Sequence, residues 1–597
     1  MSSGALCGVD TGGTFTDVVA DDGRILKVLS DARGTATPVR EGVGHFGRPR
    51  VLAHGTTVAT NALLERRGAT VALLTTRGFA DVVEIGRQDR PSLYDLYADR
   101  PEPLVPRHLR LEVDERVGAG GEVVRPLDAA SVPEIPPDAD CVAVSLLHAD
   151  INASHERAAA KVLLERGHDV VCSHEVSPEF REYERTQTTL VNAYLQPVCR
   201  AHLQGIADVA DEVLVMASGG GLLALDVAAR LPAALLLSGP AGGVRAAAAV
   251  ADSVGFADVV SFDMGGTSTD VCLIRGGVPE PAPERVVADL PVRLPSLDIH
   301  TIGAGGGSIA RIDPGGALAV GPRSAGAWPG PACYGRGGEE PTVTDADLVL
   351  GRISREAAFP GLGGLDVEAA EAALRRARTP AEGVVEVADS AMEQAVRKVS
   401  VERGVDPRSL ALVAFGGAGP LHACAVASAL DMRAVIVPPR AGVLSAVGLL
   451  CSPLQRELVR SWPTPGAHDG LDRALAALGD EARSLLGDDA GDVDVETALD
   501  CRYAGQSHEL RVPDVASFPE EHRRRNGYVP DRATIEVVAL RARASRPPRL
   551  AVGDLPPVST RRPAAGPCTL AEPDCTVWVP EGWRADVADD GSWVITR

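Results

Sequence analysis

Short apolar runs alternate with amphipathic stretches along most of the chain, and glycine clusters separate many of them. A short apolar run bounded by turn signals indicates a buried strand, whereas apolar residues at three- and four-residue spacing indicate a helix. The pattern predicts strands at 51–54, 70–75, 141–147, 169–172, 259–262 and 410–415. It predicts helices at 154–166, 180–194, 244–252, 369–377, 385–401 and 421–430. Alternating strands and helices are typical of an α/β fold.

The pattern changes near residue 455. A short helix is predicted at 471–486 and strands at 493–503 and 533–543, followed by a linker rich in Pro and Arg. At 597 residues the chain exceeds what one hydrophobic core supports, and length alone suggests about three or four domains. We expect an N-terminal domain at 1–190, a central domain at 191–455 and a small C-terminal α+β domain at 456–597.

One ten-residue segment recurs far along the chain. Asp10–Val19 and Asp263–Cys272 have the same residue at seven of ten positions, in the pattern Asp-x-Gly-Gly-Thr-x-Thr-Asp-Val-x. Each copy follows an apolar run and leads into another, which predicts a strand, a glycine turn and a second strand. Two matching turns predict two matching half-domains.

A Gly-Gly-Thr turn suits a phosphate, because backbone N–H groups approach the anion with no Cβ in the way and hydroxyls add donors. Asp10 and Asp263 end their strands, where they would meet the magnesium of a nucleoside triphosphate, directly or through water. A third glycine cluster, at 416–420, lies between a strand and a helix and suits a phosphate or the ribose of adenosine. The predicted nucleotide-binding residues are Thr11, Gly12, Gly13, Thr14, Thr16, Gly265, Gly266, Thr267, Ser268, Gly416, Gly417 and Gly419.

The composition is that of an ordinary soluble globular protein, with 45% hydrophobic and 23% charged residues. A formal net charge of −22 argues against a nucleic-acid partner or an anionic membrane, since either would favour a basic face. No signal peptide is visible at the N-terminus, and no uninterrupted apolar run is long enough for a membrane span. We expect a cytoplasmic protein.

Lysine and cysteine usage narrows the chemistry. Lysine occurs only at Lys27, Lys161 and Lys398, and none adjoins a glycine loop, which excludes a P-loop NTPase and disfavours Schiff-base chemistry. We therefore expect phosphate binding to rest on backbone N–H groups, hydroxyls and magnesium, with Arg as a further candidate. The eleven cysteines are scattered, with no zinc spacing. Cys333, in a Gly/Pro-rich loop, is either a reactive thiol or a buried small residue.

Three further features leave alternatives open. Ser238–Gly243 opens a helix and serves either to bind an anion or to pack helices closely. Asp298 and His300 contact a metal or a substrate, or His300 is a structural donor. The polar, proline-rich stretch at 86–106 predicts a loop or extended arm, of the type that often lines sites.

The order of two aspartate turns and a later Gly-Gly-Ala-Gly before a helix is that of the actin, Hsp70 and sugar-kinase superfamily, with its duplicated ribonuclease H-like domains. Along nearly the whole chain, further segments resemble the hydantoinase/oxoprolinase family, A-subunit type; the acetone carboxylase beta subunit is similar. The tail at about 546–565 looks shorter than in that family. The segments are His54-Gly-Thr-Thr, Gly86-Arg-Gln, Arg90-Pro, Ser238-Gly-Pro-Ala-Gly-Gly, Gly303-Ala-Gly-Gly-Gly-Ser, Pro329-Gly-Pro, Thr344-Asp-Ala and Phe415-Gly-Gly-Ala-Gly-Pro.

The resemblance implies an ATP-dependent amidohydrolase subunit in a homo- or hetero-oligomer. Such a chain binds Mg·ATP and phosphorylates the carbonyl oxygen of a cyclic amide or imide, such as a hydantoin, 5-oxoproline or a related lactam. A separate B subunit then completes ring opening. An amide carbonyl resists water, but its imidyl phosphate carries a good leaving group, so ATP cleavage drives the reaction. Catalysis of phosphoryl transfer requires mainly that the reactants are positioned and that the charge on the phosphates is neutralised.

On this resemblance the catalytic candidates are Asp10, Asp263 and His54, of which the two aspartates organise magnesium. Asp17 and Asp270 orient water around the metal or cap their own turns. The first half carries the substrate-side candidates on its loops, with His54 beside Thr56, Thr57, Arg87 and Gln88.

Two rival functions remain open. A small-metabolite kinase of the same fold would make a stable phosphate ester without a partner. An ATP-switched chaperone or activator would use hydrolysis to drive motion, but the tail beyond residue 490 is small for a peptide-binding module, and no cysteines at iron–sulfur spacing adjoin the turns.

Overall fold

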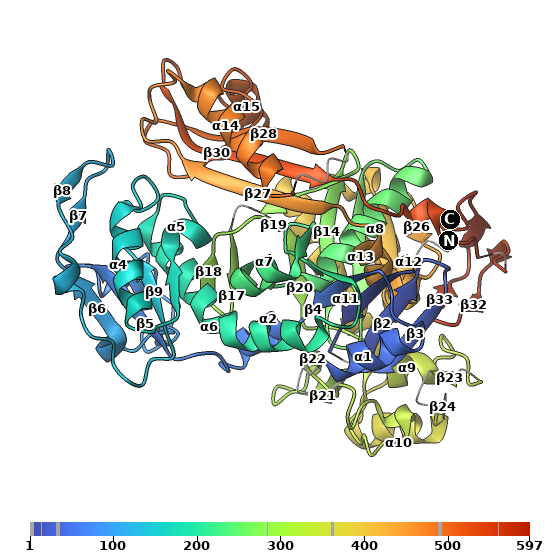
Figure 1. Cartoon of the computed structure of the whole chain (residues 1–597). Helices are drawn as coiled ribbons and strands as arrows, with labels where there is room; N and C mark the ends of the chain where they lie inside the picture. The colour runs from blue at the N-terminus through green and yellow to red at the C-terminus, as the bar shows by residue number, and fades with distance from the viewer. Residues whose placement is uncertain are drawn as a thin grey trace.

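The structure is a computed structural model, and it describes residues 5–597 except 14, 31–35, 283, 357, 360–362, 488–491 and 559. At 358 and 359 only the backbone is described. Two sheets from the two halves of the chain lie side by side in the centre of Figure 1, and an insertion extends to the left of them. The predicted strands and helices are present, with boundaries shifted by a few residues, except that the helix predicted at 180–194 continues to residue 206.

The first half contains a five-stranded unit in the order β3-β2-β1-β4-β11. β2 is antiparallel to β1, with Asp17 opposite Asp10, and to β3, with Asp17 opposite Lys27. β1, β4 and β11 are parallel. The elements are β1 (Leu6–Thr11), β2 (Phe15–Ala20), β3 (Ile25–Leu29), α1 (Thr37–Gly44), β4 (Val51–Thr56), α2 (Val58–Leu64) and β11 (Glu212–Met216).

The second half repeats this unit in the order β20-β14-β13-β25-β26. β14 is antiparallel to β13, with Asp270 opposite Asp263, and to β20, with Asp270 opposite Thr301. β13, β25 and β26 are parallel. The elements are β13 (Val259–Met264), β14 (Thr269–Arg275), β20 (Ile299–Ile302), α9 (Val343–Val349), α10 (Val367–Ala377), α11 (Ala381–Val399), β25 (Ala411–Phe415), α12 (Gly419–Ala429) and β26 (Val435–Val437). The predicted duplication is therefore present in both strand order and direction.

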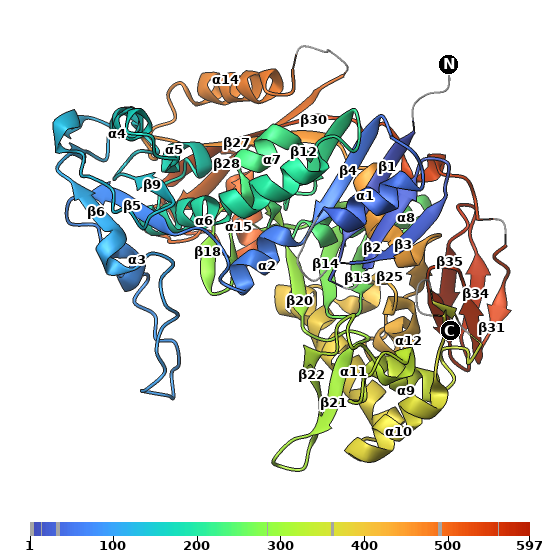
Figure 2. The ribbon, with the colours of Figure 1, turned by 60° about the horizontal axis from the view of Figure 1, so that its bottom comes forward.

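A four-stranded parallel sheet in the order β10-β9-β5-β6 is inserted into the first half. Its elements are β5 (Val71–Thr76), β6 (Arg110–Val113), β9 (Cys141–Ser145), α4 (Ser154–Glu165), β10 (Val170–Cys172) and α6 (Glu182–Ile206). Residues 86–106 form an arm without regular structure that projects from this part (Figure 2). No helix among the described residues is long and apolar enough to cross a membrane.

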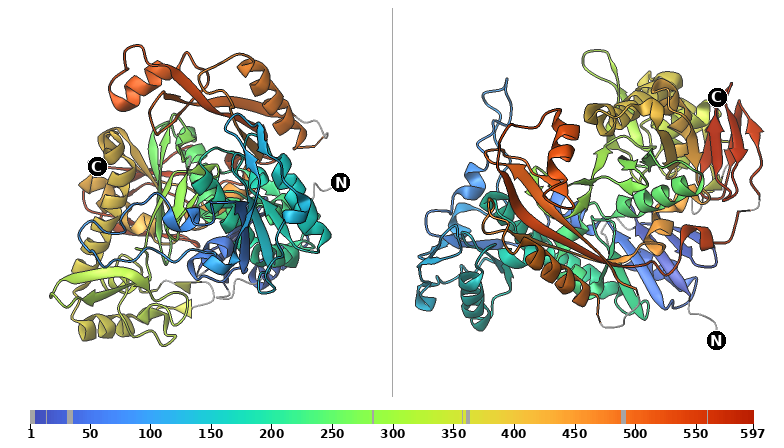
Figure 3. Two further views of the ribbon diagram at one scale, coloured as in Figure 1. Left: turned by 90° about the vertical axis from the view of Figure 1, so that its left-hand side faces the viewer. Right: turned by 90° about the horizontal axis from the view of Figure 1, so that it is seen from above.

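The expected domain boundaries differ from the structure at two places. Residue 190 falls inside α6, and β11, beyond it, still belongs to the first-half sheet. The segment expected as one C-terminal domain is divided: β27–β30 extend the first-half sheet, while β31, β34 and β35 extend the second-half sheet at β26 (Figure 3). Its strands are β27 (Leu454–Ser461), β28 (Asp494–Tyr503), β29 (Leu510–Val512), β30 (Ile535–Arg546), β31 (Ala564–Ala565), β34 (Arg584–Val587) and β35 (Trp593–Thr596).

Two helices, α8 (Gly239–Ser253) and α13 (Leu444–Leu450), pack against each other between the two halves. A Cβ on Gly448 would clash with the carbonyl of Gly242, so the backbones meet where only glycine fits. The glycines of the Ser238–Gly243 segment therefore serve close helix packing. Gly239 and Pro240 of the same segment also line the cleft described next.

Candidate active site between two aspartate turns

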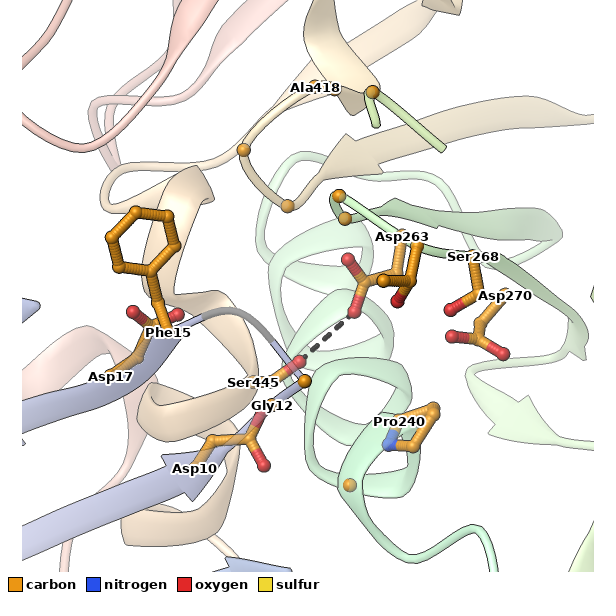
Figure 4. A pocket seen from close by; sticks show the side chains of 18 of the residues that line it. Asp10, Gly12, Phe15, Asp17, Pro240, Asp263, Ser268, Asp270, Ala418 and Ser445 are labelled. Atoms are coloured by element: carbon orange, nitrogen blue, oxygen red, sulfur yellow. Dashed lines mark hydrogen bonds between the residues drawn. The ribbon is translucent and has the colours of Figure 1, made fainter. Parts of the chain in front are cut away.

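A cleft of about 480 Å³ lies between the two halves, and both aspartate turns line it (Figure 4). The turns contribute Asp10, Thr11, Gly12, Gly13, Phe15, Asp17, Asp263, Gly265, Gly266, Thr267, Ser268 and Asp270. The structure thus brings together most of the residues that the repeat predicted. Thr14 lies outside the described residues.

The two turns have the same backbone geometry and face each other. Gly12 N donates to Phe15 O at 3.0 Å, and Gly265 N donates to Ser268 O at the equivalent position, also at 3.0 Å. A Cβ on Gly13 would lie 3.9 Å from Thr267 Oγ1, on the opposite turn. One phosphate chain between the turns can therefore be contacted from both sides.

Four carboxylates, of Asp10, Asp17, Asp263 and Asp270, are gathered at the turns. Burial raises the pKa of Asp263 to about 7, with a further contribution from Asp270, and burial raises the pKa of Asp270 to about 6. Burial, Asp17 and Asp263 raise the pKa of Asp10 well above its usual range. Asp10 Oδ1 is buried and has no hydrogen-bond partner among the described residues. A divalent cation satisfies such an oxygen and offsets the repulsion, so these residues fit a magnesium site.

Lys27, on β3, lines the cleft and corrects the expectation that no lysine serves the site. Its Nζ donates to Asp17 Oδ1 at 2.7 Å and to the carbonyl of Gly442 at 2.8 Å. Lys27 does not adjoin the glycine turn in sequence, but the β2–β3 hairpin places it opposite Asp17. The hairpin spacing was the signal that could have found it.

The second turn is supported by the glycine cluster at 303–308. Gly306 N donates to Gly265 O at 3.0 Å, and Gly307 N donates to Gly266 O at 2.7 Å. A Cβ on Gly305 would lie 2.8 Å from the backbone of Gly266. This cluster therefore fixes the second turn from behind.

The third glycine cluster forms the end of the cleft that lies toward α12. Gly416 and Gly417 line the cleft, whereas Gly419 begins α12 and is not among its lining residues. Gly416 has a φ of +77°, which favours glycine. The apolar side chains of Ile353 and Leu421 also line this end.

Asp347 is a buried lining residue of this same end that no sequence signal singled out. Its Oδ2 lies 3.2 Å from Nε2 of the fully buried His422, whose Nδ1 contacts Asp389 at 2.6 Å. The two carboxylates raise the pKa of His422 to about 10 against the opposing effect of burial. The imidazolium therefore carries the positive charge that balances this buried pair.

The opposite end of the cleft belongs to the first half. Ser238 Oγ lies 3.4 Å from the Thr56 carbonyl, and Leu237 N donates to Thr60 Oγ1 at 2.9 Å, so the segment before α8 adjoins α2. The lining residues here are Thr56, Thr57, Thr60, Asn61, Leu64, Leu237, Gly239 and Pro240. Thr56 and Thr57, two of the predicted substrate-side residues, are therefore in the cleft.

His54 does not line the cleft, which corrects its expected place on the substrate side. It is fully buried on β4, and Nε2 lies 3.0 Å from Nε2 of His202 on α6. Its Nδ1 lies 3.2 Å from the Val9 carbonyl. Burial, and then His202, lower the pKa of His54 to about 3, so the ring is neutral. Thr56, at the end of β4, lines the cleft, whereas the His54 ring is packed between the Val9 carbonyl and His202 and does not reach it.

Arg87 and Gln88 also lie outside the cleft lining. Arg87 Nε donates to Glu184 Oε1 at 2.7 Å, which ties the base of the arm to α6. Gln88 is exposed, with a φ of +60°. Thr16 is buried at the first turn and lies 3.1 Å from Ser30 Oγ rather than facing the cleft.

The remaining candidates lie outside the cleft lining. Cys333 is fully buried, and burial raises the pKa of its thiol far above the usual range, which corrects the reactive-thiol hypothesis in favour of the buried residue. Asp298 forms an ion pair with Arg403. His300, two residues on, is not among the residues that line the cleft.

Two matching β-sheet units around one cleft define the fold of the actin, Hsp70 and sugar-kinase superfamily. The model of the hydantoinase/oxoprolinase N-terminal region matches residues 6–167, and the hydantoinase/oxoprolinase model matches residues 185–458. The chain belongs to the hydantoinase/oxoprolinase family.

Two relatives and one solved structure extend this comparison. The caprolactamase subunit alpha of Pseudomonas jessenii is 32% identical, with 99% of this chain and 98% of that protein matched. The crystal structure of the ATP-dependent caprolactamase from Pseudomonas jessenii has a TM-score of 0.84 at 30% identity and covers 99% of both chains. The 5-oxoprolinase 1 of Arabidopsis thaliana is 35% identical over 84% of this chain, which corresponds to 46% of that longer protein.

Proposed function

We propose that this chain is the ATP-binding subunit of an ATP-dependent cyclic amide hydrolase. It phosphorylates the carbonyl oxygen of a lactam or related ring, and a B subunit completes hydrolysis. The observation that carries the proposal is the pair of facing turns, Asp10–Asp17 and Asp263–Asp270, on a chain that matches a caprolactamase subunit along nearly its whole length.

The cleft provides a place for each reactant. The end near Gly416 and Leu421 receives adenosine, the two turns receive the phosphates, and the end formed by α2 and Leu237–Pro240 receives the cyclic amide. Asp10 lies where the proposed phosphate and amide regions meet, since a Cβ on Gly239 would lie 3.4 Å from Asp10 Oδ1. The carbonyl oxygen can then approach the terminal phosphorus along one line.

The side chains neutralise charge during transfer. Asp10 and Asp263 would hold magnesium, which supplies positive charge beside the phosphates when bound. Lys27 places an ammonium group at the first turn, where it neutralises charge on the terminal phosphoryl group. As the carbonyl oxygen bonds to that phosphorus, the bond to the bridging oxygen breaks and ADP leaves.

A partner subunit is proposed because a relative is named as the alpha subunit of a caprolactamase. The phosphorylated amide is activated at carbon, and a second active site on a B subunit would direct water to that carbon. The C–N bond of the adduct then breaks as the ring nitrogen takes up a proton, and the ring-opened acyl phosphate is hydrolysed by a second water to an amino acid and phosphate.

The test measures ATP hydrolysis with a panel of lactams, hydantoins and 5-oxoproline, with and without the B subunit encoded by a neighbouring gene. We expect at least one cyclic amide to stimulate ATP hydrolysis, and ring-opened acid to form when the B subunit is present. A stable phosphate ester formed without the B subunit would identify a metabolite kinase instead. ATP hydrolysis unaffected by every cyclic amide would contradict the proposal.

A further inference from the structure

The amide-binding end of the cleft combines one carboxamide with apolar side chains. Asn61 lies on α2 one turn after Thr57, and its Nδ2 is 3.4 Å from Thr57 Oγ1. Leu64, 58% exposed at the end of the same helix, and Leu237 and Pro240 provide the apolar lining. The hydroxyl oxygens of three threonines that line the same end already accept hydrogen bonds within the chain, Thr56 from Val58 N, Thr57 from Asn61 and Thr60 from Leu237 N. Asn61 is the sole carboxamide among the described lining residues, and the apolar contacts around it suit a small ring with a single polar group.

The charge around this end disfavours an anion. Six aspartates line the cleft, namely Asp10, Asp17, Asp263, Asp270, Asp347 and Asp574. Of the described residues that line it, Lys27 is the sole Lys or Arg; it lies at the first turn, in contact with Asp17 and the Gly442 carbonyl, where the proposed function assigns its charge to the phosphoryl group. A carboxylate on the substrate would have no counter-charge at this end and would face Asp10. The free-energy cost of removing that carboxylate from water would therefore not be offset.

The carboxamide of Asn61 has the right arrangement of donor and acceptor to bind a ring amide. In a small lactam the amide is cis, so its N–H and C=O point to the same side of the ring. A carboxamide side chain has an N–H donor and a C=O acceptor side by side and can pair with both at once. Acyclic secondary amides are almost always trans and present the two groups on opposite sides, so they cannot form this pair.

We propose that the substrate is an uncharged cyclic cis-amide paired with the carboxamide of Asn61, and that rings bearing a carboxylate, such as 5-oxoproline, are excluded. The inference rests on the proposed function and specifies its substrate class. Its relatives are named for two different rings, a caprolactam and 5-oxoproline. The inference predicts that this chain accepts the uncharged kind and rejects the kind that bears a carboxylate.

The first experiment compares 5-oxoproline with its methyl ester, which has the same ring without the charge, and with unsubstituted lactams of five to seven members. Initial rates of ATP hydrolysis are measured with the B subunit present. We expect the ester and a neutral lactam to stimulate the rate, with a kcat/KM for 5-oxoproline at least about 100-fold below that of its ester. A 5-oxoproline value equal to that of its ester would overturn this inference and leave the proposed function intact. Failure of every ring would overturn the proposed function itself.

The second experiment tests Asn61. N-methylation removes the amide N–H, so the wild type should prefer a lactam over its N-methyl derivative by about tenfold or more in KM. Asn61→Leu should abolish that preference while leaving the affinity for a non-hydrolysable ATP analogue, measured by calorimetry, unchanged. Asn526→Leu, an exposed asparagine on α15 (Phe518–Asn526), is the matched control and should retain the preference.

Two results would contradict the role of Asn61. An undiminished preference in Asn61→Leu would show that another group pairs with the amide. An equal loss of affinity for the ATP analogue and for the lactam would show that Asn61 supports the cleft rather than the substrate.

Discussion

The two aspartate turns have the same frame but different surroundings. In each, an aspartate at the end of one strand faces an aspartate on the next, and the same backbone hydrogen bond closes the turn. The third strand differs: Asp17 lies opposite Lys27, whereas Asp270 lies opposite Thr301. Duplication thus gives the two turns the same backbone structure. The residue on the third strand, Lys27 in one copy and Thr301 in the other, makes the two turns electrostatically different.

The two turns therefore have different roles. Lys27 opposes the effect of burial on the pKa of Asp17, so the first turn carries an ion pair. Among the described residues, the side-chain partners of Asp263 and Asp270 are the hydroxyls of Ser445, Thr301 and Ser268, and burial raises the pKa values of the two aspartates to about 7 and 6. We infer that Asp263 and Asp10 hold the metal between the turns, with Asp270 beside Asp263, and that the first turn in addition neutralises the transferred phosphoryl group through Lys27.

The largest effect is expected at the second turn. Asp263→Ala removes a carboxylate that faces the phosphates, and we expect loss of Mg·ATP binding and of turnover, measured by calorimetry and phosphate release. Asp472→Ala, at an exposed position on α14 (Leu471–Ser484), is the control. Turnover at the wild-type rate in Asp263→Ala would refute a shared role for the two turns.

Lys27→Met tests the first turn. We expect about a 100-fold fall in kcat, in the range seen when one charge-stabilising donor is removed. Lys27→Arg retains the charge and should recover part of the rate. Thermal unfolding separates this effect from destabilisation, because removal of the ammonium leaves Asp17 buried without its partner. If Lys27→Met and Lys27→Arg have the same kcat, the charge at this position is not what matters.

Thr301→Val is the matched change at the second turn and should have a smaller effect. It removes the hydroxyl that donates to Asp270 Oδ1 at 2.5 Å. Loss of this bond raises the pKa of Asp270 further, so magnesium affinity should fall a few-fold at pH 7. Titration of magnesium at fixed ATP measures the change, and an effect as large as that of Lys27→Met would remove the proposed difference between the turns.

The smallest effect concerns the stability of the ligand-free protein. Because the pKa of Asp263 is about 7 in the folded chain and 3.8 in its reference state, folding favours the protonated form. Its stabilising contribution is present below about pH 4 and is lost as the pH rises through 7. Asp263→Asn should therefore lessen the fall in melting temperature between pH 5 and 8. A fall as steep as that of the wild type would contradict the raised pKa.

Motif order and repetition in the sequence predicted much of the fold and most of the turn residues that line the cleft. The two turns and the Gly416 cluster are local in sequence, so their positions followed from local pattern. Lys27 was missed because its contact depends on hairpin register. His54 was misplaced because nothing local shows which face of β4 meets α6.

The C-terminal segment was hardest to place for a similar reason. β35 pairs with β26, with Ile595 opposite Val435, across a long stretch of chain, and no periodicity reveals such a partner. Asp574, from this same segment, reaches the cleft and accepts a hydrogen bond from Gly442 N at 2.8 Å. Long-range pairing therefore contributes to the site as well as to the fold.

The central claim is that both turns bind one phosphate chain. Its most direct test is calorimetric binding of a non-hydrolysable ATP analogue with magnesium to the wild type, Gly13→Ala, Thr267→Val and the double variant, with AMP as the reference ligand. We predict that each single variant binds the analogue about tenfold more weakly, that AMP affinity is unchanged, and that the double variant departs from additivity by more than about 0.5 kcal/mol. Wild-type affinity for the analogue in either single variant would contradict the claim.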